Sequence, residues 1–177
     1  KDKKKTITSD GKNYKRISEH VGNYPCVMIS PTDVHGLLDA SEERRKFIDQ
    51  SITQYDKDYL RQLLEYNKLL KQRNALLKQF AEQKSYNKLL INTISEKMER
   101  PAQKIHEARK TFVDRISSQF SATYRHISED KEQARIEYKS SLYDAPFLQS
   151  LSESNNRDRI LQRTTKGIHK DDLKLIM

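Results

Sequence analysis

The chain has 177 residues, and 34 Lys and Arg against 25 Asp and Glu give it a formal net charge of +9. Hydrophobic residues make up 34% and charged residues 33%, and there are only four Gly and four Pro. These figures exclude a thick apolar core and a turn-dense all-β sandwich, and they favour long helices with narrow apolar faces. The single cysteine excludes an intramolecular disulfide and a multi-cysteine zinc site, which indicates a reducing, cytoplasmic setting. No run approaches the ~18 apolar residues of a membrane span, so no membrane partner is expected.

The N-terminal part of the chain is predicted to be β-rich. Lys5–Ser9 and Asn13–Ile17 flank an Asp-Gly dipeptide at 10–11 that suits the positive φ of a tight turn, which predicts two short antiparallel strands. Tyr24–Ser30 is a short apolar run ended by a proline, typical of a strand buried on both faces. Cys26 lies within this run, so an inert, buried thiol is expected.

Two helices are predicted next. The first begins at Ser41, whose side chain can cap free backbone N–H groups, and ends near Thr53. The second begins after Asp56, another capping residue, and its spacing of three and four is typical of a paired helix. The expected seam consists of Leu60, Leu63, Asn67, Leu70, Asn74, Leu77 and Ala81. We interpret the two asparagines in this seam as polar contacts that set the register rather than as ligands.

The partner of this helix is predicted to be the next segment, 86–127, where a similar spacing continues. A continuous helix of this length would extend roughly 60 Å. Pro101 removes one backbone donor, so a kink or break is expected near Arg100. The expected seam residues are Leu90, Ile94, Met98, Pro101, Ile105, Ala108, Phe112, Phe120, Tyr124 and Ile127.

The hydrophobic period changes after residue 130. Apolar and charged residues alternate over 134–139, which predicts a half-buried strand. Short helices are expected over 146–153 and 156–163. A turn at Gly167 precedes a final strand over Leu173–Met177.

The predicted fold class is therefore α+β, mainly α, with a long antiparallel helical hairpin and short flanking strands. We divide the chain into residues 1–40 (β-hairpin and strand), 41–128 (helical arm) and 129–177 (strand, short helices and return strand). The chain begins without Met and stops within an alternating stretch, so we expect an internal fragment of a longer protein.

No residues of the chain form a recognisable catalytic, cofactor or metal motif. The sequence has no GxxxxGK[ST] loop to hold a triphosphate. The five histidines show no paired ligand spacing, and no Ser/His/Asp or Cys/His arrangement is evident. We expect no enzymatic activity of this chain alone.

Four segments occur in a specific order: YPCVMISPTDVHGLL, SEERRKFID, YLRQLLEYNKLLKQRNALLK and TTKGIHKDDL. Together they resemble the RecF family of bacterial recombination mediators, which is similar to the SMC and ABC-type ATPases. The resemblance implies an ATPase head with an inserted helical lobe (lobe II). This chain would begin after the Walker A half of the head and end before the signature loop.

The resemblance also implies partners and cofactors. The whole protein is expected to bind ATP and magnesium, to be a weak ATPase and to form an ATP-dependent homodimer. It is expected to bind single-stranded and gapped or junction DNA, and to help load RecA together with RecO and RecR. None of the residues present here is expected to hold the nucleotide.

Carried over by resemblance, Ser30, Pro31 and Asp33 match the family's SP-x-D turn from head to lobe, which we liken to the glutamine loop of related ATPases. A strand end and a turn cap would explain the same residues without any nucleotide sensing. Arg44 and Arg45 match the paired arginines of the first lobe helix. With two glutamates directly before them, they could instead make only local ion pairs.

The second carried-over motif is the GIHKDD turn, which in RecF-like proteins comes shortly before the signature loop. The resemblance makes its four polar residues candidates for a head–lobe junction or an interface: His169, Lys170, Asp171 and Asp172. The alternative is a structural turn in which one aspartate accepts backbone N–H groups and the lysine is solvated.

The basic residues are concentrated between 61 and 104, where ten basic and four acidic residues give +6. Such a patch can attract the phosphates of DNA without base specificity, although lysines on long helices also serve solubility alone. The candidate DNA-binding residues are Arg61, Lys68, Lys71, Arg73, Lys78, Lys84 and Lys88. The alternative functions are a non-enzymatic helical hairpin that binds a protein or a second copy, and a freestanding coiled-coil adaptor.

Overall fold

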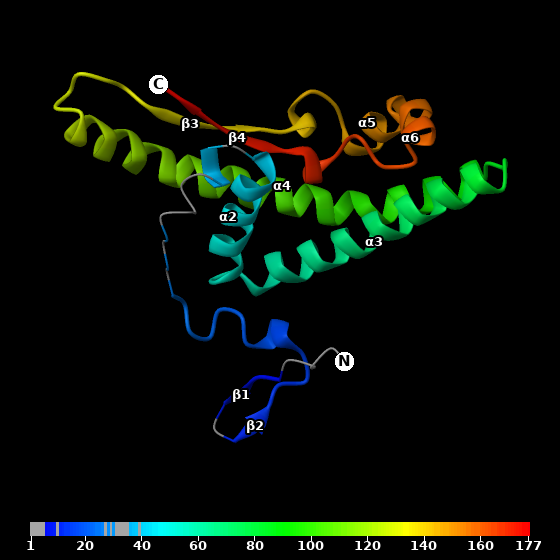
Figure 1. Ribbon diagram of the computed structural model, residues 1–177, viewed down its shortest axis with the longest axis horizontal. Coiled ribbons are helices and arrows are strands. Elements are labelled where there is room, and N and C mark those ends of the chain that lie inside the picture. The colour runs from blue at the N-terminus through cyan, green and yellow to red at the C-terminus, as the bar shows by residue number, and fades with distance from the viewer. Residues whose placement is uncertain (1–5, 10, 27, 29, 31–35, 39) are drawn as a thin grey trace.

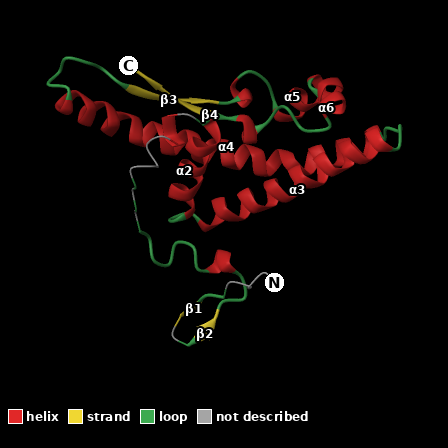
Figure 2. Ribbon diagram, viewed as in Figure 1, coloured by secondary structure: helices red, strands yellow, loops and turns green. Residues whose placement is uncertain are grey.

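Long helices dominate the fold, which the computed structural model describes for residues 6–9, 11–26, 28, 30, 36–38 and 40–177 (Figures 1 and 2). The three long helices are α2 (Ser41–Thr53), α3 (Lys57–Glu82) and α4 (Lys88–Ile127). Two short helices follow, α5 (Phe147–Glu153) and α6 (Asn155–Leu161). There are two strand pairs, β1 (Thr8–Ser9) with β2 (Lys12–Asn13) and β3 (Arg135–Lys139) with β4 (Asp172–Ile176). Short 3-10 helices cover Ile17–Glu19, Ser141–Tyr143 and Ile168–Lys170. The mainly helical α+β class is confirmed.

Helices α3 and α4 form the predicted hairpin, and they lie side by side with a short turn between them (Figure 1). Each helix begins with a side-chain cap. Asp56 accepts a hydrogen bond from the Tyr59 backbone N–H at 2.9 Å, and Asn87 accepts one from Leu90 at 3.0 Å. These caps satisfy N–H groups that have no partner within the helix. The start of α2 differs from the prediction, because Ala40 rather than Ser41 is its N-cap and provides no side-chain bond.

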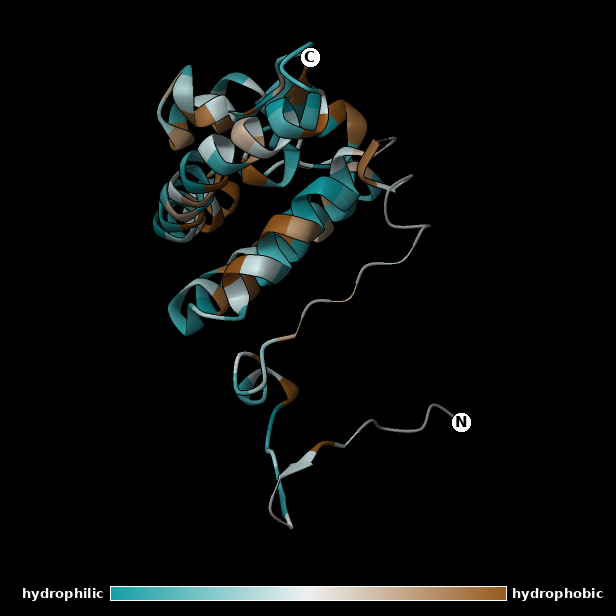
Figure 3. Ribbon diagram, turned by 90° about the vertical axis from the view of Figure 1, so that its left-hand side faces the viewer, coloured by the Kyte–Doolittle hydropathy of each residue, from teal (hydrophilic) through white to brown (hydrophobic). Residues whose placement is uncertain are grey.

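The seam predicted for α3 is confirmed at Leu77, whereas its other fully buried residues lie one position before the predicted ones. The buried residues are Tyr59, Gln62, Tyr66, Leu69, Arg73, Leu77 and Phe80. A count of aliphatic residues alone missed this face because two tyrosines, a glutamine and an arginine occupy it. Figure 3 shows hydrophilic and hydrophobic residues following one another along these helices. Of the two seam asparagines, Asn67 is exposed, and Asn74 binds a distant loop described below.

Helix α4 continues without a break through Pro101. The predicted break near Arg100 does not occur. The proline ring is buried next to Ala102, with Met98 and Ile105 one turn away on either side. Packing of this face compensates for the single backbone hydrogen bond that a proline removes.

The second half of the chain folds back along the hairpin. Strands β3 and β4 pair antiparallel, with Tyr138 opposite Leu173, and β3 contacts α4 while β4 contacts α2. Helix α5 packs on α4, and α6 lies beside α3 (Figure 1). This return brings residues 164–172 against three helices at once.

The predicted N-terminal hairpin is confirmed over β1 and β2, with Gly11 at φ +76° in its turn. The strand predicted over Tyr24–Ser30 was wrong, because the described residues of this run have no strand and are mostly exposed. A strand buried on both faces needs neighbours on both sides, and the described part of the chain places none there. Cys26 is accordingly exposed rather than buried, and its backbone N–H donates to Gln54 at 3.0 Å.

Among the helices that the structure describes, none has an apolar stretch long enough to cross a membrane.

Candidate functional site

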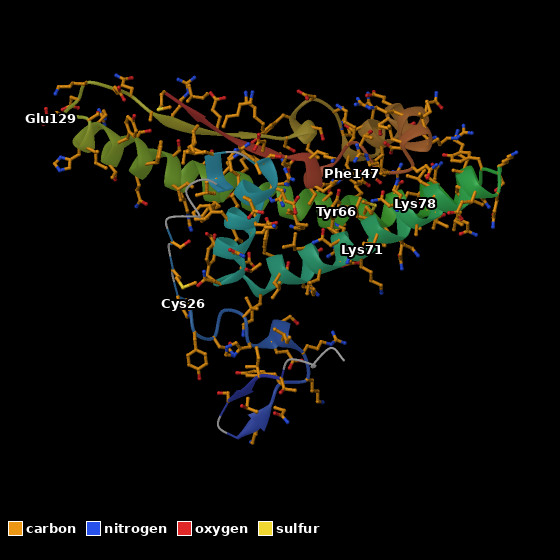
Figure 4. All side chains as sticks on the ribbon, viewed as in Figure 1. Cys26, Tyr66, Lys71, Lys78, Glu129 and Phe147 are labelled. Atoms are coloured by element: carbon orange, nitrogen blue, oxygen red, sulfur yellow. The ribbon has the colours of Figure 1, made fainter. Side chains whose placement is uncertain are left out.

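The candidate site is the C-terminal turn, which we define as residues 164–172. It leads from α6 into β4 and contains a short 3-10 helix, Ile168–Lys170. Gly167 has φ +118°, a conformation that side chains with a Cβ rarely adopt. A Cβ at this position would lie 2.8 Å from the Tyr66 hydroxyl and 3.3 Å from the Phe147 ring. Figure 4 labels these two aromatic residues, which contact each other edge to face. The glycine therefore lets the turn approach α3 closely.

His169 fixes the turn to α3. Its Nε2 lies 3.1 Å from the Thr164 carbonyl oxygen and therefore donates, which leaves Nδ1 to accept from the Tyr66 hydroxyl at 2.9 Å. Acceptance at Nδ1 requires the neutral imidazole, whereas the neutral and the charged ring can both donate from Nε2. Burial of the ring lowers the pKa of His169 to about 4, because the charged form would lose its hydration.

Arg44 and Arg45 fix the same turn to α2. The guanidinium of Arg44 makes two parallel bonds to the Asp172 carboxylate, at 2.8 and 3.0 Å, and this hydrogen-bonded ion pair raises the pKa of Arg44. Arg45 donates to the Asp171 carbonyl oxygen at 2.6 Å, and burial lowers the pKa of Arg45. The alternative that these arginines pair only with the adjacent glutamates is wrong, since the partner of Arg44 lies 128 residues away and Lys46 pairs with those glutamates instead.

Arg109 of α4 joins three elements, and the sequence analysis did not identify it. It is 2% exposed and makes two bonds to Asp49 of α2, each 3.0 Å long. It also donates to the Ile168 carbonyl oxygen at 2.8 Å and to the Asp171 carboxylate at 3.1 Å. Tyr138 of β3 donates to the same Asp171 oxygen at 2.5 Å. Burial raises the pKa of Asp171, and the two donors oppose this shift.

Arg73 is a second buried arginine, and it was predicted to bind DNA. That prediction is corrected here, because Arg73 is 1% exposed and held by the Asp158 carboxylate at 2.7 Å. It also donates to the Thr164 hydroxyl at 2.7 Å. The next residue, Asn74, accepts from the backbone and hydroxyl of Thr164 at 2.8 and 2.7 Å. The Arg-Asn pair of α3 thus holds the start of the C-terminal turn.

The structure therefore brings together most of the predicted junction residues, with Lys170 exposed at the surface. Asp172 also accepts from the backbone N–H of Leu173 at 2.8 Å, as a structural turn requires. Ser30 is described and lies in the N-terminal connection, whereas Pro31 and Asp33 lie outside the described residues. In chemical terms the turn is a set of ion pairs and a neutral histidine, and the buried Oδ1 of Asp171 has no hydrogen-bond partner among the described residues. It connects α2, α3 and α4 with β4.

The remaining candidate DNA-binding residues are exposed, and three of them share the outer face of α3, which we define as Lys68, Lys71 and Lys78. Figure 4 labels Lys71 and Lys78 along the second half of this helix. Within the described residues none of the three pairs with a carboxylate, whereas Arg61 pairs with Asp58. Lys84 and Lys88 lie at the tip of the hairpin. No group of His, Cys, Asp and Glu that could hold a metal occurs in the part of the chain that is described.

No protein-family model matches the chain. Curated proteins and solved structures do match it, and they agree with the resemblance found in the sequence. The chain is 38% identical over 175 residues to the DNA replication and repair protein RecF of Cytophaga hutchinsonii, and 39% identical over 173 residues to that of Flavobacterium johnsoniae. It is 40% identical over 174 residues to that of Bacteroides fragilis. These alignments cover 98–99% of the chain and 46–48% of the relatives, so the chain spans about half the length of the curated relatives it matches.

Two solved structures of the recombination mediator protein RecF in the RecFOR pathway are similar to this fold, one described with ATPrS and one with ATP. Both superpose with a TM-score of 0.88, at 28% and 27% sequence identity. They cover 97% of this chain, which covers 48% of each of them. The resemblance inferred from the four sequence segments is confirmed.

Proposed function

Because the chain belongs to the RecF family, of whose curated relatives it spans about half, we propose that it forms the helical arm of a DNA-binding replication and repair protein. The whole protein would bind single-stranded and gapped or junction DNA in the cytoplasm, dimerise with ATP and magnesium, and help load RecA with RecO and RecR. ATP would bind outside this chain, which has no phosphate loop. Residues 41–128 would be the arm, and residues 1–40 and 129–177 would connect it to the ATPase head.

The proposal of DNA binding rests on the three exposed lysines on the outer face of α3. Its three lysines project from one rigid helix, and the first and last are separated by about 15 Å along the axis at 1.5 Å per residue. Three phosphate contacts would give a slope of about −2.7 for the logarithm of affinity against the logarithm of salt concentration. The affinity would therefore fall roughly 40-fold between 50 and 200 mM salt. Contacts of this kind attract any sequence, which suits a protein that recognises DNA structures.

The test is a salt titration of DNA binding by this chain, with a fluorescent gapped duplex. Lys68→Glu with Lys71→Glu should weaken binding at 50 mM salt and reduce the salt slope by about 1.8, since two phosphate contacts are lost. The matched control is Lys97→Glu with Lys110→Glu, which makes the same charge change at two exposed positions of α4. Equal weakening by both pairs would mean that only the net charge matters.

A second function, a protein-binding arm, is favoured by one observation. Leu64 is 52% exposed between the basic residues of α3, where a purely phosphate-binding helix needs no apolar side chain. If the paired lysine substitutions leave DNA affinity and slope unchanged, the arm binds a protein or a second copy instead.

A further inference from the structure

A groove of about 720 Å³ lies at the tip of the arm. It is lined by residues from the end of α3, the turn into α4 and α6, and Figure 1 shows these elements at the same end of the hairpin. Its floor is apolar, with Leu77 and Phe80 at 2% and 8% exposure. Ile160 of α6 lines the groove and remains 80% exposed, so nothing in the described chain covers it. The groove is distinct from the outer face of α3 and from the C-terminal turn.

The rim of this groove is basic. Lys84 and Arg159 line it, and further exposed cations lie on the same two segments, 79–88 and 155–163: Lys88, Arg157 and Arg163. These segments contain two carboxylates. Glu82 is exposed, whereas Asp158 is buried and neutralised by Arg73. The exposed charge around the apolar floor is therefore strongly positive, and it complements an acidic ligand.

We propose that this groove binds an acidic peptide segment with a large apolar side chain, supplied by a partner protein. The apolar side chain would lie between Phe80 and Ile160, and flanking carboxylates would pair with Lys84 and Arg159. A short peptide with one apolar anchor residue and charged residues on both sides fits this groove, because helices enclose its apolar floor on two sides.

Two other occupants fit the groove less well. A nucleobase would need an open aromatic face, but the Tyr86 ring is covered by the Arg159 guanidinium at 4.3 Å and meets the edge of Phe80 at 5.7 Å. The Tyr86 hydroxyl is also engaged, since it donates to Asn155 at 2.7 Å. A second copy of the same face would bring like charges together.

The experiment measures fluorescence polarisation of a labelled peptide, Glu-Asp-Asp-Leu-Phe-Asp-Glu-Glu, with the chain at low salt. The same peptide with Ser-Ser in place of Leu-Phe reports the charge contribution alone. Ile160→Ser should weaken binding of the first peptide about fivefold, because partial burial of an aliphatic side chain is lost. Arg159→Glu should weaken binding of both peptides about tenfold or more.

Two matched controls make the same chemical changes away from the groove. Ile127→Ser removes an exposed isoleucine at the end of α4, and Arg125→Glu reverses an exposed charge in the same region. Neither should change peptide affinity by more than about twofold if the groove is the site. Unfolding curves of all four variants should match the parent chain, since each altered side chain is exposed.

Three outcomes would overturn the proposal. Equal affinity for the two peptides, or no effect of Ile160→Ser, would mean that the apolar floor is not used. Displacement of the bound peptide by a single-stranded oligonucleotide, with Ile160→Ser weakening the oligonucleotide equally, would make the groove a nucleic-acid site. Concentration-dependent dimerisation that Ile160→Ser abolishes would make it a self-association surface. The DNA test above uses other residues, so either proposal can fail alone.

Discussion

The neutral, partly buried His169 predicts a specific loss of stability in mild acid. Its folded-state pKa of about 4 lies below the ordinary value of 6.5, so the unfolded chain binds the proton more readily than the folded chain. The contribution of this histidine to stability is therefore complete above pH 6.5 and decreases as the pH falls toward 4. By linkage, the total loss is about 3 kcal/mol, of which about 2 kcal/mol is already lost at pH 5.

The assay is urea unfolding of the chain and of His169→Gln at pH 7 and pH 5. Glutamine keeps a donor for the Thr164 carbonyl but does not titrate. The destabilisation caused by His169→Gln should therefore be about 2 kcal/mol smaller at pH 5 than at pH 7, because the parent chain loses that contribution. Acidic groups and His106, whose pKa burial also lowers, titrate in both proteins and cancel in the difference.

If the effect of His169→Gln is independent of pH, the imidazole is not held neutral by burial and by the Tyr66 hydroxyl, and the reasoning from the position of this ring is refuted.

Three further predictions concern the same turn. Gly167→Ala should lower the free energy of unfolding by about 2–3 kcal/mol in urea, because its Cβ would meet the Tyr66 hydroxyl in a strained backbone conformation; an unchanged value would contradict the close approach. Arg73→Leu should cost about 3–5 kcal/mol because it leaves the Asp158 carboxylate buried without its partner, and adding Asp158→Asn should recover part of that loss in thermal unfolding. Asp172→Ala should cost about 1–2 kcal/mol if the pair with its arginine is purely structural. A normal melting temperature together with impaired ATP-dependent dimerisation of the whole protein would instead indicate an interface role.

Local signals in the sequence predicted the elements of this fold well. The cap at Asp56, the long helical period and the strand alternation before residue 139 depend on neighbours within one or two turns, and the structure has α3, α4 and β3 in those places. The same holds for the tight turn at Gly11. Each of these features is decided by backbone sterics and periodicity, which a single sequence contains.

Features that depend on distant partners could not be predicted in the same way. Arg73 looked like part of a basic surface because its partner, Asp158, lies 85 residues further along the chain. Arg109 gave no signal at all, although its guanidinium binds Asp49 of α2, Tyr59 of α3 and the C-terminal turn. The strand expected over Tyr24–Ser30 needed neighbouring strands that the described residues do not provide. In the sequence alone, the two members of a buried ion pair cannot be distinguished from two surface charges, because only the fold brings them together.

The contacts of the C-terminal turn bear on how the arm would respond to the rest of the protein. Arg44 binds Asp172 at the start of β4, Arg45 binds the Asp171 carbonyl, and Arg109 connects α4 to both the turn and α2. A displacement of β4 alone would separate these bonds, including the pair of Arg109 with Asp171, and breaking such a fully buried pair costs several kcal/mol. His169 connects the same turn to Tyr66 of α3. We therefore infer that α2, α3, α4 and β4 move together as one body, so that a displacement of β4 would reorient the outer face of α3 without changing its shape.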